Sequence, residues 1–304
     1  MNKKQLLLTG ADGQLGETIQ QQWSSAPISQ RYDLHAFAKQ QLDITDSDSL
    51  GNRLNALAID VIINAAAYTA VDKAEEHEEG AFAVNKDGPK NLALWAKFAG
   101  AKLIHISTDF VFDGTNRAPY REQDTTNPLG VYGASKLAGE LAVTEILPND
   151  SIVVRASWVY SQYKNNFVKT MLRLMAEKES LNVVNDQIGS PTSTNSLTSF
   201  IFDVISSEKG SGIYHWSDQG AISWYDFAMA IQEEGLAAGL LDNSIPISPI
   251  STDLYATPAT RPAYSVLDCA KAEADFVCTM APWREQLQRV IQSMQDRDKS
   301  SGTL

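Results

Sequence analysis

Short apolar segments alternate with longer segments of helical periodicity through the first half of the chain. The apolar segments are rich in Val, Ile and Leu without a regular alternation of polar residues, which is typical of parallel strands covered on both faces. Five of them predict strands: residues 5–8, 34–38, 61–64, 102–107 and 151–156. Four segments between them have the apolar spacing of helices: residues 16–23, 47–58, 79–99 and 131–147. Strands alternating with helices indicate an α/β fold with a doubly wound parallel sheet. In the third helix we expect the large apolar side chains to face the core: Phe82, Leu92, Trp95 and Phe98.

The pattern changes after about residue 160. Four further helices are predicted over residues 166–177, 196–206, 224–235 and 283–294. They are separated by a segment rich in Asn, Ser, Thr and Pro at residues 181–192 and by a proline-punctuated stretch at residues 245–262. A chain of 304 residues is near the size at which a single core stops growing. We therefore predict a larger domain over residues 1–160 and a smaller α/β domain formed mainly by residues 161–304, with part of residues 215–240 packing back on the first.

The chain is acidic, with 25 Lys and Arg against 37 Asp and Glu and a formal net charge of −12. This balance repels phosphate backbones and argues against nucleic acid or an anionic membrane as a partner. No apolar segment approaches the ~18 residues of a membrane-spanning helix, and the apolar run at residues 6–8 is too short for a signal peptide. The two Cys and four His lack the spacing of a disulfide framework or a metal site. We expect a cytoplasmic protein without a bound metal.

A glycine-rich segment follows the first predicted strand and opens the first predicted helix. Residues 9–16 read Thr-Gly-Ala-Asp-Gly-Gln-Leu-Gly, a G-x-x-G-x-x-G pattern. Glycines in such a turn let the backbone approach a pyrophosphate, and the helix N-terminus adds N–H groups and the positive end of its dipole. Between a strand and a helix, this pattern predicts the dinucleotide site of a Rossmann domain. The residues expected to contact the cofactor here are Gly10, Asp12, Gly13, Gln14, Leu15 and Gly16.

The end of the second predicted strand bears on which cofactor is used. NAD sites usually place a carboxylate there to hold the ribose 2′-hydroxyl. Residues 35–39 read His-Ala-Phe-Ala-Lys, and Asp33 lies too early in the strand. Lys39 can meet a 2′-phosphate instead, although it can equally be a solvated surface lysine. We therefore expect NADPH as the cofactor, with NADH as an alternative.

A tyrosine and a lysine four residues apart are candidates for acid–base chemistry. Tyr132 and Lys136 lie on one face of a predicted helix, where an adjacent ammonium would stabilise a phenolate. Such pairs also arise by chance, and Tyr160 and Lys164 have the same spacing. Context favours Tyr132, because Tyr160 enters an Asn-rich loop instead of a long helix. Thr108 follows the fourth predicted strand, so its hydroxyl can meet a carbonyl oxygen at the sheet edge where ligands bind.

Longer strings resemble a known family. Residues 9–16, 64–67, 107–114 and 132–140 are similar to those of the extended short-chain dehydrogenases/reductases. Four strings resemble, more narrowly, the dTDP-4-dehydrorhamnose reductase family: residues 64–75, 155–160, 165–167 and 185–192. The first of these strings reads Asn-Ala-Ala-Ala-Tyr-Thr-Ala-Val-Asp-Lys-Ala-Glu. The resemblance covers about residues 5–290, and its strings are far more specific than the glycine or Tyr–Lys motifs.

The resemblance implies NADPH-dependent reduction of the 4-keto group of dTDP-4-dehydro-L-rhamnose to dTDP-L-rhamnose, the last step of dTDP-rhamnose biosynthesis for cell-surface polysaccharide. It implies Tyr132 as proton donor, Lys136 as the group that lowers its pKa and holds the nicotinamide ribose, and Thr108 as a donor to the carbonyl oxygen. The further residues implied at the cofactor are Asp43, Ile44, Ala65, Ala66 and Ala67, and those implied at the substrate are Asp109, Trp158 and Arg261. Trp158 would pack on the sugar and Arg261 would neutralise the diphosphate. The alternatives are a core role for Trp158 and a surface role for Arg261.

The chain also departs from the family pattern. Ala38 stands where many members carry Asp, which argues against NADH. Some members join two subunits through Mg²⁺ held by glutamates, but Thr18 and Asn195 occupy the matching positions here, so we expect no metal bridge. A homodimer of another kind stays open.

Two other functions also stay open. One is another nucleotide-sugar reductase or epimerase, because a fold alone does not fix the substrate. The other is a non-catalytic dinucleotide-binding regulatory subunit. The presence of Thr108, Tyr132 and Lys136 argues against a regulatory subunit, because a binding module does not need groups that deliver a proton.

Overall fold

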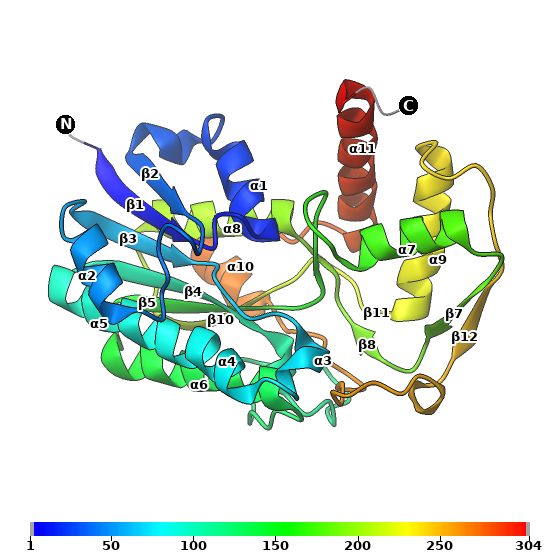
Figure 1. The fold of residues 1–304 in the computed structure, drawn as a ribbon, viewed down its shortest axis with the longest axis horizontal. Helices are drawn as coiled ribbons and strands as arrows, with labels where there is room; N and C mark the ends of the chain where they lie inside the picture. Colours follow the sequence, from blue (N-terminus) through cyan, green and yellow to red (C-terminus); the bar gives the residue numbers. More distant parts are fainter. Residues whose placement is uncertain (1–2, 302–304) are drawn as a thin grey trace.

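The central sheet has six parallel strands in the order β10-β5-β4-β3-β1-β2 in the computed structural model, which describes residues 3–301 (Figure 1). The strands are β1 (Lys4–Thr9), β2 (Tyr32–Phe37), β3 (Ile59–Asn64), β4 (Lys102–Thr108), β5 (Ser151–Ala156) and β10 (Gly212–Trp216). Neighbouring strands in this order all run parallel. The strand order changes direction between β1 and β3, and doubly wound sheets bind their ligands at such a switch point. The predicted doubly wound α/β fold is confirmed.

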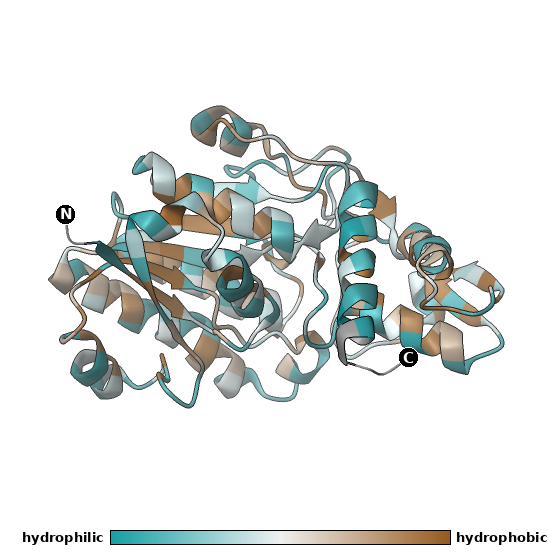
Figure 2. Ribbon diagram, turned by 90° about the horizontal axis from the view of Figure 1, so that it is seen from above, coloured by the Kyte–Doolittle hydropathy of each residue, from teal (hydrophilic) through white to brown (hydrophobic). Residues whose placement is uncertain are grey.

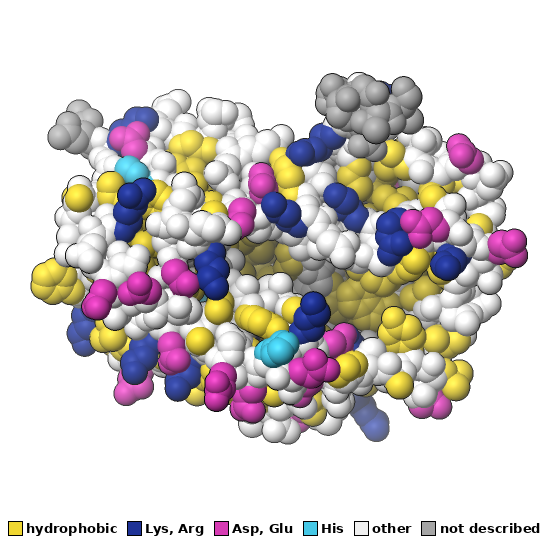
Figure 3. Space-filling view, in the orientation of Figure 1, with side chains coloured by type: hydrophobic (Ala, Val, Ile, Leu, Met, Phe, Trp, Pro, Cys, Tyr) yellow, Lys and Arg dark blue, Asp and Glu magenta, His cyan; other side chains and the backbone are white. Residues whose placement is uncertain are grey.

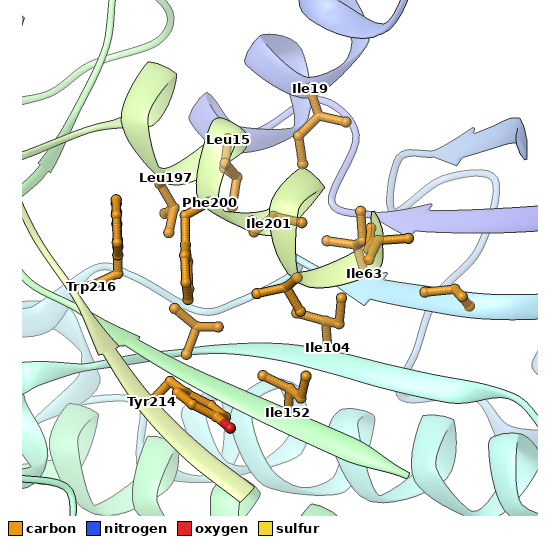
Figure 4. Packing of buried hydrophobic residues seen from close by; sticks show 14 of the residues in the cluster. Leu15, Ile19, Ile63, Ile104, Ile152, Leu197, Phe200, Ile201, Tyr214 and Trp216 are labelled. Carbon is orange, nitrogen blue, oxygen red and sulfur yellow. The ribbon is translucent and has the colours of Figure 1, made fainter. Parts of the chain in front are cut away.

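Helices cover both faces of this sheet. On one face lie α1 (Gln14–Trp23), α8 (Thr194–Ser207) and α10 (Ala270–Phe276), and on the other lie α2 (Ser47–Leu54), α5 (Gly88–Ala99) and α6 (Val131–Ile146). Successive strand residues point to opposite faces, so Leu6 and Leu8 enter the first core while Leu7 enters the second. Figure 4 shows side chains of α1 and α8 packed over the strand residues Ile63, Ile104 and Ile152. Figure 2 shows the same arrangement by hydropathy, with apolar strands enclosed between the helices.

The predicted strands and helices of the first half are present, with some ends shifted by a few residues and one helix divided. The pattern does not predict β10, a five-residue strand that reaches the sheet edge beside β5. The predicted helix over residues 79–99 is divided into α4 (Glu78–Phe82), a π-helical turn (Ala83–Asp87) and α5. The core position expected for Phe98 is wrong, because this side chain is 85 % exposed. Leu92 on the same helix is fully buried.

The remaining elements enclose a third core. It is built by α7 (Phe167–Glu177), α9 (Trp224–Ala237) and α11 (Trp283–Ser301) together with β7 (Leu181–Val184), which pairs with β12 (Ile247–Ile250). Two short pairs join the parts, β6 (Val159–Tyr160) with β9 (Thr192–Ser193) and β8 (Ile188–Gly189) with β11 (Ile222–Ser223). The chain between β9 and β11 returns to the large sheet, where α8 packs on α1 and β10 pairs with β5. The division into domains at residue 160 stays a prediction. No described helix is long and apolar enough to cross a membrane.

A buried ion pair fixes α6 to the sheet. Arg155 on β5 and Glu140 on α6 each have side chains that are 2 % exposed, and Nη2 of Arg155 lies 2.7 Å from Oε2 of Glu140. Nε of Arg155 also donates to Oε1 of Glu140 at 3.0 Å, and the Ser107 hydroxyl on β4 donates to the same oxygen. These contacts join α6 to the C-terminal ends of β4 and β5.

We predict that Arg155→Met lowers the free energy of unfolding by about 3–5 kcal/mol, because it leaves the Glu140 carboxylate buried without its cation. The double variant Glu140→Leu, Arg155→Met should lose much less, since an apolar pair of similar volume often replaces a buried ion pair at little cost. Urea unfolding measures both variants. Equal losses would contradict an origin in uncompensated charge.

Candidate active site

A cavity of about 670 Å³ lies at the C-terminal edge of the sheet, between the sheet and the elements of the second half. Figure 3 shows a hollow near the centre of this face, with hydrophobic side chains in its floor. Eleven residues predicted at the site line it: Gly13, Gln14, Leu15, Ala65, Ala67, Thr108, Asp109, Tyr132, Lys136, Trp158 and Arg261. The structure therefore brings residues that are widely spaced in the sequence into one cavity.

A second hollow of about 160 Å³ shares Gly13, Ala65 and Ala67 with the first. The other predicted residues that line it are Gly10, Asp12, Lys39, Asp43, Ile44 and Ala66. Among the described residues predicted for the site, Gly16 lines neither hollow and lies buried within α1. The two hollows together form an extended site with room for a dinucleotide next to a substrate.

The turn between β1 and α1 has the geometry of a pyrophosphate cradle. Gly10 has a φ of +68°, and a Cβ on this residue would lie 2.6 Å from the backbone nitrogen of Ala66, so a side chain is excluded. Gly13 is the N-cap of α1, and Gln14 and Leu15 begin that helix at the cavity wall. Backbone N–H groups and the positive end of the helix dipole are thereby offered to an anion. These residues fit a dinucleotide cofactor.

The residues lining the smaller hollow include one lysine, Lys39, and two carboxylates, Asp12 and Asp43. Nζ of Lys39 lies 3.8 Å from Asp43, and the Lys39 side chain is well exposed. Burial opposes ionisation of Asp43, but hydrogen bonds from Thr45 and the Lys39 charge together lower its pKa below the usual value. Lys39 is therefore placed where a cation can contact the adenosine half of a dinucleotide.

The candidate catalytic groups meet where β4 ends and α6 begins. Thr108 is the last residue of β4, Tyr132 is the second residue of α6, and Lys136 follows one turn later. Nζ of Lys136 donates a hydrogen bond of 2.6 Å to the carbonyl of Ile106, which holds this buried side chain against the strand. The Tyr132 ring packs edge-on against Phe110 at 5.7 Å between centroids.

Burial controls the protonation of these groups. It raises the pKa of Tyr132 to about 12, partly offset by a hydrogen bond with Thr108. It lowers the pKa of Lys136 to about 8, opposed by the negative charge of Glu140. The direction for Tyr132 is opposite to the expected lowering by Lys136, because desolvation disfavours the phenolate more than the Thr108 hydrogen bond favours it, and the negative charge of Asp109 raises the pKa further. Tyr132 consequently keeps its proton at neutral pH and can act as a donor.

Asp109 is a buried carboxyl directly beside Thr108. Its side chain is almost fully buried, and its Oδ1 accepts a hydrogen bond of 3.1 Å from the Thr108 hydroxyl. Its Oδ2 has no hydrogen-bond partner among the described residues. Burial raises the pKa of Asp109 to about 6, against the effect of hydrogen bonds from Ser265 and Thr108. The Asp109 residue lines the cavity, while its unpaired oxygen is itself shielded from solvent.

Trp158 and Arg261 have partners other than those expected from the sequence. The Trp158 indole stacks on Trp224 with 3.5 Å between ring centroids, and its backbone has a φ of +45°. Nη2 of Arg261 lies 2.8 Å from Asp72, and its Nη1 donates to Thr257 at 2.6 Å. Both residues line the cavity, so the expected contacts with sugar and diphosphate stay predictions.

Asn85 is a fully buried residue behind the site that sequence reasoning missed. It lies in the π-helical turn, where its side chain exchanges hydrogen bonds of 2.8 and 3.0 Å with the backbone of Tyr68 and donates to Ser135 at 3.0 Å. It thereby connects the segment after β3 to α6. A π-helical turn inside a helix has no signal in the spacing of apolar residues, although such turns often mark functional sites.

Glu75 was also missed, and it caps the catalytic helix. The N-cap of α6 is Gly130, which has no side chain to accept from the first N–H groups. The Glu75 carboxylate performs this role from 56 residues away, accepting a hydrogen bond of 2.9 Å from the backbone nitrogen of Val131. A Cβ on Gly130 would lie 2.5 Å from this carboxylate oxygen, so glycine is needed for the contact. Glu75 therefore sets the start of the helix that carries Tyr132.

Thr18 and Asn195, which occupy the positions of the metal-binding glutamates of some family members, each form a side-chain hydrogen bond. The hydroxyl oxygens of Thr18 and Thr194 lie 2.7 Å apart, and Gln22 donates to Asn195 at 2.9 Å. Within the described part of the chain, no three His, Cys, Asp or Glu side chains are grouped as a metal site would require. The expected lack of a metal bridge stays a prediction.

A Rossmann sheet with a glycine-rich turn and a Tyr–Lys pair above it defines the class of this protein, the NAD(P)H-dependent oxidoreductases of the short-chain type. Comparisons with known proteins narrow the class. The family model described as RmlD substrate binding domain matches residues 4–296. The chain belongs to this family, that of the dTDP-4-dehydrorhamnose reductases.

Individual relatives match over nearly their whole length. The dTDP-4-dehydrorhamnose reductase of Aggregatibacter actinomycetemcomitans is 40 % identical over 290 residues, which cover 94 % of this chain and 97 % of the relative. That of Escherichia coli K12 is 36 % identical over 295 residues, covering 95 % and 97 %. The crystal structure of the reductase of Bacillus anthracis in complex with NADP is similar with a TM-score of 0.89 and 38 % identity, covering 96 % of this chain and all of that one.

We predict that Glu75→Ala lowers kcat by about tenfold, because loss of the cap lets the first turn of α6 shift and small displacements of catalytic groups are costly. Glu75→Gln, which keeps an acceptor oxygen, should retain more activity. Glu76→Ala is the matched control, since Glu76 is the exposed neighbour. Steady-state kinetics with saturating cofactor measures the effect. The capping role fails if the Glu75→Ala and Glu76→Ala proteins have equal kcat.

Proposed function

We propose that this chain is a dTDP-4-dehydrorhamnose reductase, which uses NADPH to reduce the 4-keto group of dTDP-4-dehydro-L-rhamnose to dTDP-L-rhamnose. The observation that carries the proposal is the placement of Thr108, Tyr132 and Lys136 around one cavity that continues into a dinucleotide hollow. The names of the relatives that match over nearly their whole length support the substrate.

The chain's own residues manage the charge that forms on the carbonyl oxygen. Bound NADPH supplies the hydride for the carbonyl carbon. Tyr132, protonated at neutral pH, gives its proton to the developing alkoxide, and the Thr108 hydroxyl donates a further hydrogen bond to it. The Lys136 ammonium, fixed on the Ile106 carbonyl, provides positive charge as the Tyr132 phenolate forms. Asp109 lines the same cavity and is a further residue expected at the substrate.

The proposed function is tested by following NADPH absorbance when the purified protein meets enzymatically prepared dTDP-4-dehydro-L-rhamnose. Rapid oxidation with formation of dTDP-L-rhamnose is expected. Parallel reactions with NADH and with the UDP analogue show the preference for cofactor and base. NADPH binding without reduction of the keto sugar would leave the fold assignment intact and refute the substrate.

The role of Tyr132 predicts that Tyr132→Phe lowers kcat by about 10²- to 10⁴-fold with little change in the Kd of NADPH, because only the transferable proton is removed. Tyr160→Phe is the matched control, since Tyr160 belongs to the second Tyr–Lys pair and also lines the cavity. Its kcat should stay near that of the unmodified protein. The assignment is wrong if Tyr160→Phe is the variant that loses turnover.

The position of Lys39 predicts that Lys39→Ala raises the Kd of NADPH by about tenfold more than that of NADH. The physical reason is that only NADPH carries a 2′-phosphate for the ammonium to contact. Fluorescence titration of both reduced cofactors measures the ratio, with the exposed Lys97→Ala as control. Equal changes in the Kd of the two cofactors would show that Lys39 is a surface lysine without a contact to the 2′-phosphate.

Two finer expectations belong to the same proposal. A homodimer is supported by exposed apolar side chains on the neighbouring helices α5 and α6, namely Leu94, Phe98 and Leu141. The cytoplasm is the expected location because the proposed reaction consumes NADPH. Light scattering and cell fractionation test these two expectations separately.

A further inference from the structure

One segment of the second half of the chain, residues 252–264, reaches across to the first half, and we call it the strap. At its start the Thr252 hydroxyl donates a hydrogen bond of 2.6 Å to Asp186. Its other end is hydrogen-bonded to the backbone of Ile188. Both ends are therefore held by the second half. Figure 1 shows the strap in orange, passing next to the short helix α3 (Val71–Ala74) of the first half.

The middle of the strap is fastened to α3 by Asp72. Nη2 of Arg261 lies 2.8 Å from Oδ2 of Asp72, and the backbone nitrogen of Ala259 donates to Oδ1 at 3.3 Å. Nη1 of Arg261 also donates to the Thr257 hydroxyl at 2.6 Å and to the Ala259 carbonyl at 3.1 Å, which ties the guanidinium to its own strap. The hydrogen bond from Arg261 holds the pKa of Asp72 below its ordinary value, so the carboxylate is ionised at neutral pH.

The same short helix holds the start of α6. Glu75 follows α3 directly and accepts the hydrogen bond of 2.9 Å from the backbone nitrogen of Val131. Asp72 and Glu75 are less than one helical turn apart. A helix of four residues is not stable by itself, so its position depends on the contacts that its side chains make. Two carboxylates therefore connect the strap, through α3, to the first turn of α6.

This connection runs along the cavity in which the reaction is proposed. Arg261 of the strap, Val71 of α3 and Tyr132 of α6 all line that cavity. The ion pair of Arg261 with Asp72 is partly open to solvent, with side chains that are 23 % and 40 % exposed. Such pairs contribute little to global stability, so stability alone does not explain the arrangement.

We infer that Asp72 is a positioning residue, which transmits the position of the strap through α3 and Glu75 to the turn of α6 that carries Tyr132. The inference rests on the proposed function, since it gives Asp72 a part in the reduction. Asp72 touches no reacting group. Without its contact to the strap, α3 keeps one of its two fastenings, and the start of α6 can shift. A small displacement of a proton donor lowers the rate strongly.

Steady-state kinetics of the full-length protein with saturating NADPH and keto sugar tests this role. Asp72→Ala should lower kcat by about tenfold, because Tyr132 is less well aligned, and should leave the Kd of NADPH within about twofold. Asp72→Glu keeps a carboxylate for Arg261 and should recover part of the lost kcat. Asp186→Ala is the matched control, since it removes the carboxylate at the start of the strap and leaves α3 untouched. Its kcat should stay within about twofold of the unmodified protein.

The double variant Asp72→Ala, Glu75→Ala shows whether the two carboxylates act through one connection. If they do, its kcat should fall by about tenfold, as in the more damaging single variant. Independent effects would multiply to about a hundredfold loss, which would contradict transmission through α3.

Hydrogen exchange measured by mass spectrometry gives a readout that needs no substrate. The first turn of α6, residues 131–134, should exchange faster in Asp72→Ala and in Glu75→Ala than in the unmodified protein. Asp186→Ala should leave the exchange of this turn unchanged.

The inference and the proposed function can fail separately. Unchanged kcat and unchanged exchange in Asp72→Ala overturn the inference and leave the proposed function standing. Equal losses in Asp72→Ala and Asp186→Ala also overturn it, because any loosening of the strap would then have the same effect. If the unmodified protein does not reduce the keto sugar, the proposed function fails and the part of Asp72 in the reduction fails with it.

Discussion

The packing of helix α6 against strands β4 and β5 is the constraint on which the rest of the site depends. Lys136 donates a hydrogen bond of 2.6 Å to the backbone carbonyl of Ile106 on β4. One turn later, the Glu140 carboxylate accepts a hydrogen bond from Ser107 and forms an ion pair with Arg155. These contacts fix both the rotation of the helix and its height along the sheet. A shift by one residue would turn Tyr132 about 100° around the helix axis and away from Thr108. Glu75 holds the start of the same helix.

This packing also creates the electrostatic environment of the reaction. Desolvation sets the protonation of the buried groups in the cleft, which are Tyr132, Lys136 and Asp109. Desolvation keeps the Tyr132 phenol protonated and lowers the pKa of Lys136 to about 8. A neutral donor beside a buried cation is suited to a reaction that turns a carbonyl into an alkoxide. The charges and hydrogen-bond donors of the site are therefore already positioned by the fold before a ligand binds.

Much of the fold follows from local patterns, because parallel strands buried on both faces have continuous apolar sequences. The site residues on the turns after β1 and β4 could also be placed, since ligands bind at the C-terminal edge of such a sheet. What could not be predicted depends on distant contacts. β10 joins the sheet only through its pairing with β5, and Phe98 is exposed although its position in the helix pattern appeared apolar and inward. Glu75 and Asn85 act through partners about 50 residues away, which no spacing within a motif records.

The central claim is that this cleft reduces a carbonyl with hydride from NADPH and a proton from the protein. It is tested most directly by supplying dTDP-4-dehydro-L-rhamnose together with NADPH that carries deuterium at both C4 positions of the nicotinamide, and analysing the product by NMR. The account predicts dTDP-L-rhamnose with one deuterium on C4 of the sugar for every NADPH oxidised. Product without deuterium at C4, or sugar conversion without net oxidation of NADPH, would contradict it.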